Sequence, residues 1–443
     1  MKSFERLCIA AHYMRARMRG RRWTDRAALE RWQQARVIRH LERIRETSAF
    51  YRELWGERPV SEWEKYPIID KQAMMEGFDR LNTAGISRDE AFKLALAAES
   101  TRDFTPAIGH TTVGLSSGTS GSRGLFLVSR RERLAWAGTV LARVLPGSLL
   151  DRHAIAFFLR ADSNLYGTVG GGRIDFQFYD LLNPPDQHIA RLNRQRPTVL
   201  VGPPSMLRLL AEASRSGLLR IQPQRVIGVA EVLEELDRRF IEEAFGQKLH
   251  QVYQCTEGFL GATCGHGTLH LNEDIVCVQK EALDEQSGRF APIITDFSRM
   301  AQPIIRYRLN DVLTERSEPC PCGSVLLPIA RIEGRCDDIL TWPALSGAGM
   351  VTVFPDYISR AIISASELIL AYHAVWAEKE RILNISLEVK QEAVAAEIRE
   401  QVAREIAGLC DRLGCRLPEL RFLPYTFEPG ARKLRRVERR ASS

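Results

Sequence analysis

The chain has no hydrophobic run long enough to cross a lipid bilayer. Its apolar stretches, such as residues 154–159, fall well short of the roughly 20 residues that a spanning helix needs. No apolar segment of the signal-peptide type follows the first residues, and Glu5, Asp25 and Glu30 argue against an organellar transit peptide. We therefore expect a soluble, cytoplasmic protein without a membrane partner.

A disulfide framework and a large excess of charge are also lacking. Nine cysteines, an odd number, are spread over 443 residues, which favours a reducing setting over a small secreted domain. The net charge of +7 is modest, but basic residues cluster in residues 15–26 and 432–440. Such clusters could contact nucleic acid, acidic lipid or an acidic carrier protein. Solvated basic segments are the more common explanation, and we expect no nucleic-acid partner.

In the middle of the chain, short apolar runs alternate with amphipathic helical segments. The runs suited to buried strands are residues 154–159, 198–201, 225–230 and 249–254. Residues 205–217 predict a helix with Ser205 as its N-cap and Gly217 as its stop, and residues 231–246 predict another helix that ends at a glycine. The alternation implies an α/β architecture with parallel strands, whose ligands gather at the carboxyl ends of the strands.

The length of the chain favours more than one domain. The predicted domains are an N-terminal core over residues 1–334, which starts with a helical lead-in over 1–95, and a small lid domain over residues 335–443. We expect parallel-strand-rich sheets with helices in the core, where residues 27–55 have the spacing of one long amphipathic helix. An alternating strand over 382–389 and a charged helix over 392–413 indicate that the small domain is a mobile α+β unit.

A loop rich in hydroxyls and glycines follows an apolar lead-in and is suited to binding phosphate. Its candidate ligands are Ser116, Ser117, Gly118, Thr119, Ser120, Gly121 and Arg123. Glycines allow successive N–H groups to turn toward an anion, and hydroxyls and a guanidinium add donors. A flexible Ser/Gly linker is the alternative, but a predicted strand over 125–128 and a predicted helix over 133–144 flank the loop closely. No Gly-Lys-Ser/Thr follows, so this is not a P-loop.

Residues 116–121, Ser-Ser-Gly-Thr-Ser-Gly, resemble the phosphate-binding loop of the adenylate-forming (ANL) superfamily. Three later segments resemble further motifs of this superfamily in the same order, namely residues 253–258 (aromatic-Gly-x-Thr-Glu), 303–311 (Arg-Tyr-Arg-Thr-Gly-Asp) and 331–340 (Gly-Arg-x-Asp-Asp). Residues 230–231, 295–297 and 353–356 resemble the phenylacetate–coenzyme A ligase branch and its relatives, the coenzyme F390 synthetases. The resemblance covers essentially the whole chain.

The resemblance implies that the protein binds ATP and Mg²⁺. The glycine loop would hold the β- and γ-phosphates, Thr256 would meet the α-phosphate, and Glu257 would help to hold Mg²⁺ as a hard carboxylate ligand. In the same superfamily, an aspartate at the position of Asp311 binds the ribose hydroxyls. The adenine would lie against Tyr253 and residues Ala230 and Glu231.

The resemblance also implies a hinge between the two domains, near residues 333–338. This hinge would include Arg335, counted among the ATP ligands, together with Asp337 and Asp338. The small domain would carry the catalytic lysine of the family's terminal Gly-Lys-x-x-Arg-Val loop. Lys433 matches when Lys-Leu-Arg-Arg-Val is the anchor, and Arg432 matches when the distance from Gly430 is used. Such a cation would bridge the substrate carboxylate and the α-phosphate.

Thiols and imidazoles crowd together in residues 264–270 and 320–322. Cys264, His270, Cys320 and Cys322 would supply four ligands of the type that zinc takes in structural sites, and His266 is a competing ligand. The resemblance implies a small zinc site in this region. Reduced cysteines in loops are the alternative.

Together these features predict a ligase that activates an organic, aromatic acid as its acyl-adenylate and releases pyrophosphate. The acyl group would then pass to the thiol of coenzyme A or of a carrier protein. The sequence leaves open whether the protein forms a homodimer. We expect the acyl pocket near residues 157–166 and 202–205.

Two alternatives remain at this stage. One is AMP transfer to a phenolic hydroxyl, as in the deazaflavin relatives. The other is a nucleotide-binding protein whose catalysis has decayed, which is suggested by Ser122 and Arg123 in place of Lys-Pro and by Asn310 in place of a glycine.

Overall fold

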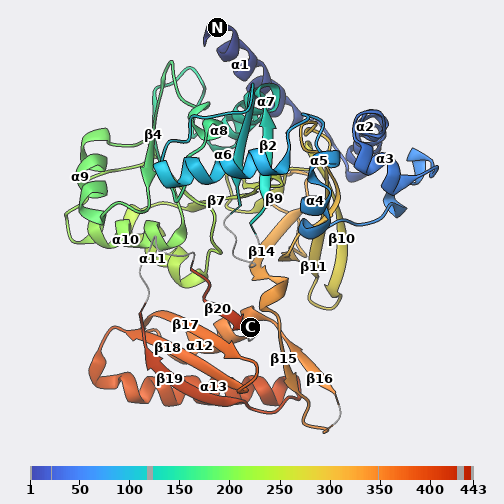
Figure 1. The fold of residues 1–443 in the computed structure, drawn as a ribbon. Coiled ribbons are helices and arrows are strands. Elements are labelled where there is room, and N and C mark those ends of the chain that lie inside the picture. The colour runs from blue at the N-terminus through green and yellow to red at the C-terminus, as the bar shows by residue number, and fades with distance from the viewer. Residues whose placement is uncertain (1, 21, 117–122, 348, 427–433, 441–443) are drawn as a thin grey trace. The chain divides into compact units, whose positions relative to one another are not determined.

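The computed structural model describes residues 2–20, 22–116, 123–347, 349–426 and 434–440 (Figure 1). The chain forms two compact units. The first unit comprises Met1–Ala230, Phe240–Leu309 and Leu313–Arg331, and the second comprises Glu231–Arg239, Asn310–Val312 and Ile332–Ser443. Among the described residues, no helix has both the length and the apolar character that spanning a membrane requires.

Parallel strands form one half of the large sheet. In spatial order they are β4 (Ile174–Asp180), β3 (His153–Leu159), β5 (Val199–Gly202), β6 (Arg225–Gly228) and β7 (Leu249–Cys255). Four of these strands overlap the four predicted apolar runs and confirm the α/β class, whereas β4 was not predicted. Buried residues such as Val199, Leu200 and Ile227 explain why the runs are apolar throughout, because helices cover both faces of a parallel sheet.

The other half of the sheet is largely antiparallel. It contains β8 (Gly258–Thr263), β9 (Leu269–Leu271), β14 (Pro328–Arg335), β13 (Asp311–Glu315), β11 (Arg289–Asp296) and β10 (Val276–Asp284), and β12 (Ile304–Arg308) pairs with β11. The two halves join where β7, the last parallel strand, pairs antiparallel with β8 through a tight turn. This turn contains Thr256 and Glu257.

The predicted single helix over 27–55 is wrong, because the chain breaks at Ser48. Helix α2 (Arg26–Thr47) ends there and α3 (Ala49–Trp55) begins, with the Ser48 hydroxyl accepting a hydrogen bond from the Tyr51 amide. The same hydroxyl donates to the carbonyl of Leu81 at 2.9 Å. A serine N-cap thus turns a continuous apolar pattern into two helices.

Among the remaining helices of the first unit, α10 begins at a different residue from the one predicted. These helices are α1 (Lys2–Arg19), α4 (Lys71–Glu76), α5 (Phe78–Leu81), α6 (Arg88–Thr101), α7 (Arg130–Val144), α8 (Asn164–Gly167), α9 (Pro185–Gln195) and α10 (Pro204–Arg215). Ser205 is not the N-cap of α10, because Pro203 takes that position and Pro204 is the first helical residue, where proline's missing N–H costs nothing. Helix α11 (Glu235–Phe245) ends at Gly246, as predicted.

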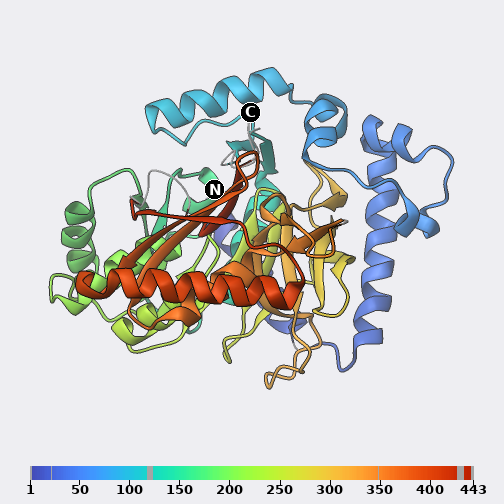
Figure 2. The ribbon, with the colours of Figure 1, turned by 90° about the horizontal axis from the view of Figure 1, so that it is seen from below.

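The second unit is an α+β unit with its own core. Its sheet has the order β19 (Glu419–Pro424), β18 (Ile382–Val389), β17 (Ile369–Ala377) and β20 (Val437–Arg440), beside a hairpin of β15 (Leu340–Pro343) and β16 (Met350–Val353). Ile362 of helix α12 (Pro355–Ala365), Val402 of helix α13 (Ala395–Leu413) and Tyr372 of the sheet belong to one buried core cluster. Figure 2 shows α13 lying along the strands of this sheet. The predicted strand over 382–389 is confirmed. The predicted helix begins at Ala395, after a 3-10 turn over Glu392–Val394.

Candidate active site and metal centre

A β-hairpin holds the two ends of the glycine loop together. Strands β1 (Thr111–Leu115) and β2 (Leu125–Ser129) pair antiparallel along their whole length. Beyond them the Ser116 amide donates to the Gly124 carbonyl at 2.7 Å, and the Gly124 amide donates to the Ser116 hydroxyl at 2.7 Å. We call Ser116, Arg123 and Gly124 the loop neck. The predicted ligands Ser117, Gly118, Thr119, Ser120 and Gly121 lie outside the described residues.

The two cations at the loop neck are Arg123 and Lys71. The Arg123 guanidinium pairs with Glu99 of α6 and donates to the Ser116 carbonyl at 3.3 Å. A Cβ atom placed on Gly124 would lie 2.9 Å from Cε of Lys71, so the lysine side chain passes directly over the neck. Lys71 was not among the predicted site residues, because residues 67–75 indicate only a helix start in the sequence.

The turn between β7 and β8 presents Thr256 and Glu257, and we call it the carboxylate turn. Oε1 of Glu257 accepts a hydrogen bond from the Tyr307 hydroxyl at 2.9 Å, and Oε2 accepts one from the Thr256 hydroxyl at 2.9 Å. Burial, followed by the charge of Glu257, raises the pKa of Tyr307. The phenol therefore stays protonated and serves as a donor to the carboxylate.

Arg299 joins the carboxylate turn to the hairpin of the glycine loop. This buried guanidinium donates to the Thr256 carbonyl at 2.7 Å and to the Leu127 carbonyl of β2 at 2.9 Å. Nearby, the Gln302 side chain accepts from the Leu127 amide at 2.8 Å and donates to the Leu125 carbonyl at 3.1 Å. The segment before β12 thus fixes the position of β2 relative to the turn.

Beneath the turn, Asp296 is a fully buried carboxylate. It accepts hydrogen bonds from the amide and the hydroxyl of Ser298, at 2.8 and 2.6 Å. A Cβ atom on Gly258 would lie 3.1 Å from its Oδ2, so it packs directly below the turn. Burial raises the pKa of Asp296 to about 6, although these hydrogen bonds and Arg299 lower it in part.

A short backbone bridge brings Lys71 to the same place. The Ile69 amide donates to the Arg306 carbonyl at 3.0 Å, and the Arg308 amide donates to the Ile69 carbonyl at 2.8 Å, so that Ile69 pairs with Tyr307. Arg306 has a φ of 47°, a conformation that is rare for a residue with a side chain. The first unit therefore gathers the loop neck, the carboxylate turn and β12 around Lys71 and Tyr307.

Ala230 and Tyr253 lie at the carboxyl ends of adjacent strands β6 and β7. Ala230 has a φ of 67°, a left-handed backbone conformation that is rare for a residue with a side chain. Backbone strain of this kind is typical of functional sites. Tyr253 is buried in β7. Both places agree with the rule that ligands of parallel sheets gather at these ends.

Four partly exposed aromatic residues from α7, β3, α8 and β4 form one cluster of rings. The ring centroids of Phe157 and Tyr166 lie 4.8 Å apart, and those of Trp136 and Tyr166 lie 5.8 Å apart. Phe176 lies 5.7 Å from Phe157. The indole of Trp136 donates to Gln254 at 3.1 Å, two residues before Thr256 of the carboxylate turn. Phe157 and Tyr166 are in the predicted acyl segment, whereas Trp136 and Phe176 were missed because helix spacing and strand alternation explain them equally well.

The predicted ligands at the hinge and in the small domain belong to the second unit. Asn310 pairs with Asp337, and Sγ of Cys336 lies 3.7 Å from the Asp311 carbonyl as a donor. Oε1 of Glu231 accepts from the Leu434 amide at 3.1 Å. Arg335 directly precedes the 3-10 turn Cys336–Asp338. Lys433 and Arg432 lie outside the described residues.

Asp338 is an anchor inside the second unit. It is buried, forms an ion pair with Arg435 and accepts a hydrogen bond from the Arg439 amide at 3.3 Å. Burial raises the pKa of Asp338, although Arg435 lowers it in part. Nearby Gly334 has a φ of 137°, which residues with a side chain rarely adopt.

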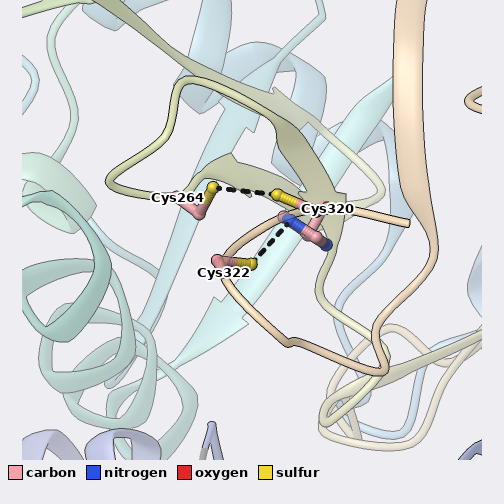
Figure 3. Close-up of side chains that lie close together, drawn as sticks. Cys264, Cys320 and Cys322 are labelled. Carbon is pink, nitrogen blue, oxygen red and sulfur yellow. Dashed lines mark hydrogen bonds between the residues drawn. The ribbon is translucent and has the colours of Figure 1, made fainter. Parts of the chain in front are cut away.

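The structure brings together the four predicted zinc ligands, Cys264, His270, Cys320 and Cys322. One ligand atom from each lies within 4.8 Å of the others (Figure 3). The sulfurs of Cys264 and Cys320 are 3.7 Å apart, close to the ~3.8 Å expected for two sulfurs bound at ~2.3 Å to one tetrahedral ion. His266 is not a member of the group.

The histidine of this cluster is oriented for metal binding. Nδ1 of His270 lies 2.9 Å from the Leu326 carbonyl, so this nitrogen carries the proton and Nε2 has a free lone pair. Nε2 lies 3.4 Å from Sγ of Cys322. A metal bound at Nε2 would thus meet the thiols directly.

The thiols of the cluster differ in their readiness to ionise. Burial opposes ionisation of Cys320, but hydrogen bonds from Thr268 and from the Cys322 backbone lower the pKa of this thiol to about 6. Burial raises the pKa of Cys322 to about 12. A metal ion would supply the positive charge that a second thiolate requires.

Comparisons with known proteins agree with this architecture. No protein-family model matches the chain. Among solved structures, 2-hydroxyisobutyryl-CoA ligase in complex with its acyl-adenylate gives a TM-score of 0.67 at 18% identity, over 92% of this chain and 89% of that one. An acyl acid amido synthetase gives a TM-score of 0.55 at 13% identity, over 85% and 82% of the two chains. The chain therefore has the fold of the adenylate-forming ligases, as the sequence motifs predicted.

A sequence comparison agrees with the likeness in fold. Phenylacetate-coenzyme A ligase from Thermus thermophilus is 26% identical over 283 residues, which cover 55% of this chain. The match spans 60% of that relative's length. The predicted likeness to the phenylacetate–coenzyme A ligase branch is thereby confirmed.

Proposed function

We propose that the protein activates an organic acid with ATP and then transfers the acyl group to a thiol. The observation that carries this proposal is the gathering of the loop neck, the carboxylate turn and β12 around Lys71 and Tyr307. These segments carry the motifs whose relatives bind the phosphates and the metal of ATP. The likeness to a phenylacetate–coenzyme A ligase supports the same reaction class.

In the first step, a carboxylate oxygen of the acid attacks the α-phosphorus of ATP. A new oxygen–phosphorus bond forms, the bond to the β-phosphate oxygen breaks, and pyrophosphate leaves. Lys71 and Arg123 are the cations at the loop neck that would balance the charge of the departing phosphates. Lys433 would act at the α-phosphate from the small domain.

Glu257 fits the role of a magnesium ligand. Its carboxylate is partly exposed, and Tyr307 and Thr256 fix its orientation from opposite oxygens. Mg²⁺ would neutralise phosphate charge when bound there. Arg299 holds the turn through the Thr256 carbonyl, so the carboxylate is positioned before the nucleotide arrives.

The acid that we propose is aromatic. Trp136, Phe157, Tyr166 and Phe176 offer partly exposed ring surfaces beside Gln254. Rings of this kind favour offset or edge-on contacts with another ring. An aliphatic acid would gain only the burial of its apolar area.

In the second step, a thiol would attack the carbonyl carbon of the adenylate, the carbon–oxygen bond to phosphate would break, and AMP would leave as the thioester forms. We propose that a rotation between the steps uses Gly334 to Asp337 as its pivot. Gly334 has the conformational freedom, whereas Asp338 is fixed to Arg435 and Arg439 within the second unit. Coenzyme A and a carrier phosphopantetheine are the candidate acceptors.

We propose that the cysteine–histidine cluster holds a structural zinc ion. The distances between its ligand atoms fit a tetrahedral ion, and four protein ligands leave no position open for catalysis. Bound there, zinc would pin the turn after β8 to the segment before β14. Since the site needs thiolates, we infer a reducing, cytoplasmic setting.

The test is ATP–pyrophosphate exchange with a panel of aryl and alkyl acids. Exchange that depends on an aryl acid supports the proposal, and its absence with every acid would overturn carboxylate activation. Mass spectrometry of the product distinguishes the phenol alternative, because that reaction yields a stable adenylated phenol and needs no thiol. ATP binding without pyrophosphate release would indicate decayed catalysis.

A further inference from the structure

Helix α1 leaves an apolar stripe uncovered on its outer side. Its inner side packs on α7 (Figure 1), where Tyr13 and Ala16 are buried and a Cβ atom on Gly138 would lie 2.5 Å from the Ile9 carbonyl. The stripe consists of Phe4, Leu7, Ala11, Met14 and Met18, all of which are exposed. The four large side chains are exposed by 67, 68, 57 and 69%.

The spacing of these residues places them on a single face. Steps of three and four residues keep side chains in line along a helix, and the stripe is ~21 Å long at 1.5 Å per residue. The close contact with α7 fixes which side of α1 faces outward. An ordered apolar stripe of this length differs from the isolated exposed apolar residues that most protein surfaces carry.

Positive charge is concentrated beside the stripe. Residues 1–26 contain eight Lys and Arg residues against two acidic residues, which gives +6 of the chain's net +7. Arg6, Arg15, Arg17 and Arg22 are exposed. The rest of the chain has a net charge of only +1, although residues 432–440 form a second basic cluster.

Helix α2 extends the basic region. Burial first, and then the charges of Arg39, Arg15, Arg22 and Arg43, lower the pKa of Arg36. The guanidinium groups of Arg19 and Arg36 lie 5.6 and 5.4 Å from the Trp32 ring, so two helices contribute to one cluster. Such a cluster of like charges is costly in the free protein and favours an anionic partner.

We propose that this face of α1, together with the arginines of α2, docks on a lipid bilayer that contains anionic phospholipids. Apolar side chains in line, flanked by arginines, are the features of a helix that lies in the membrane interface. A nucleic-acid backbone would match the arginines but would leave Phe4, Leu7, Met14 and Met18 in water. This proposal differs from the sequence-based expectation of no membrane partner, in which the basic clusters were interpreted as solvated segments.

The test is co-sedimentation of the full chain with vesicles. We expect binding to phosphatidylcholine vesicles with about 30% phosphatidylglycerol, weakening as salt rises, and little binding to pure phosphatidylcholine. Replacing two arginines, R15Q/R22Q, should lower the partition coefficient about 30-fold at low salt. The double change M14S/M18S should lower it about tenfold, because two apolar side chains no longer insert.

Matched controls lie on the exposed surface near α9 and α10. L182S/L218S and R194Q/R220Q remove the same kinds of side chain elsewhere and should leave the partition coefficient unchanged. The α1 variants should keep the thermal midpoint and pyrophosphate exchange of the parent protein, since their side chains are exposed. Equal binding to both kinds of vesicle, no binding, or tighter binding to a DNA duplex at the same salt would overturn the proposal.

Discussion

The carboxylate turn and the cysteine–histidine cluster lie on neighbouring parts of one sheet but are held in different ways. At the turn, protein groups already satisfy the key atoms, as Tyr307 and Thr256 bind Glu257 while Arg299 binds the Thr256 carbonyl. At the cluster, three thiols and an imidazole face one another with contacts of 3.4 to 3.7 Å. The carboxylate turn is thus positioned by protein groups alone, whereas the proposed zinc ion would hold the ligands of the cluster together.

Among the substitutions that test this difference between the two sites, Glu257→Gln should have the largest effect on activity. The amide keeps the shape but loses the charge that would hold Mg²⁺, so pyrophosphate exchange should fall about 10²- to 10³-fold with little change in the thermal midpoint. Glu315→Gln, at an exposed pair with Lys280, is the control and should retain full activity. Wild-type exchange in Glu257→Gln would remove Glu257 from the site.

At the cysteine–histidine cluster, Cys264→Ser should lower metal content and stability, whereas Glu257→Gln should lower activity. The bound zinc, measured by mass spectrometry of the metal content, should fall from about one ion per chain, with a loss of about 2–4 kcal/mol in the free energy of unfolding. Cys8→Ser, outside the cluster, should keep both values. If the purified parent protein carries no zinc and a chelator leaves its unfolding unchanged, the structural role is wrong.

Arg299→Lys should affect both stability and activity. Lysine lacks the planar guanidinium that donates to the Thr256 and Leu127 carbonyls at the same time. We therefore expect a loss of about 2 kcal/mol in unfolding free energy. If Arg299 positions the turn, the kcat of exchange should also fall while the KM for the acid stays constant. A stability loss with unchanged kcat would limit Arg299 to a structural role.

Lys71→Met should raise the KM for ATP about tenfold, which corresponds to about 1.4 kcal/mol. The methionine keeps the length of the stem but removes the charge over the loop neck. Lys93→Met on the exposed side of α6 is the matched control. An unchanged KM would show that Lys71 does not meet the phosphates.

The smallest effect concerns pH. Burial raises the pKa of Asp296 to about 6, above its unfolded value near 4, so the folded state binds this proton more tightly. The stabilisation is present at low pH and is lost as pH rises through 6. Relative to Asp296→Asn, the parent protein should lose about 1.4 kcal/mol of unfolding free energy between pH 5 and pH 7, measured by urea titration.

Much of the fold could be predicted from local pattern. The strands of the parallel half follow from apolar runs, and the ends of α10 and α11 follow from glycines. The break at Ser48 could not be predicted, because the apolar spacing continues through it and only the contact of its hydroxyl with Leu81 reveals the turn. The antiparallel half was also missed, although several of its pairs join strands that are neighbours in the chain, namely β7–β8, β8–β9 and β10–β11.

The site was predicted to the extent that its residues lie in motifs. Glu257 was predicted from its resemblance to a superfamily motif, and the four cluster residues were predicted from residue type together with that resemblance. Lys71, Arg299 and Trp136 were not, because each acts through a segment far away in sequence and shows no local signal. The backbone bridge at Ile69 is the contact that makes Lys71 part of the site.

Hydrogen–deuterium exchange with ATP, Mg²⁺ and an aryl acid most directly tests whether one nucleotide site unites these segments. The account predicts that residues 69–71, the loop neck, the carboxylate turn and β12 gain protection together, and that this joint change is lost in Glu257→Gln. Protection confined to a single one of these segments would contradict it.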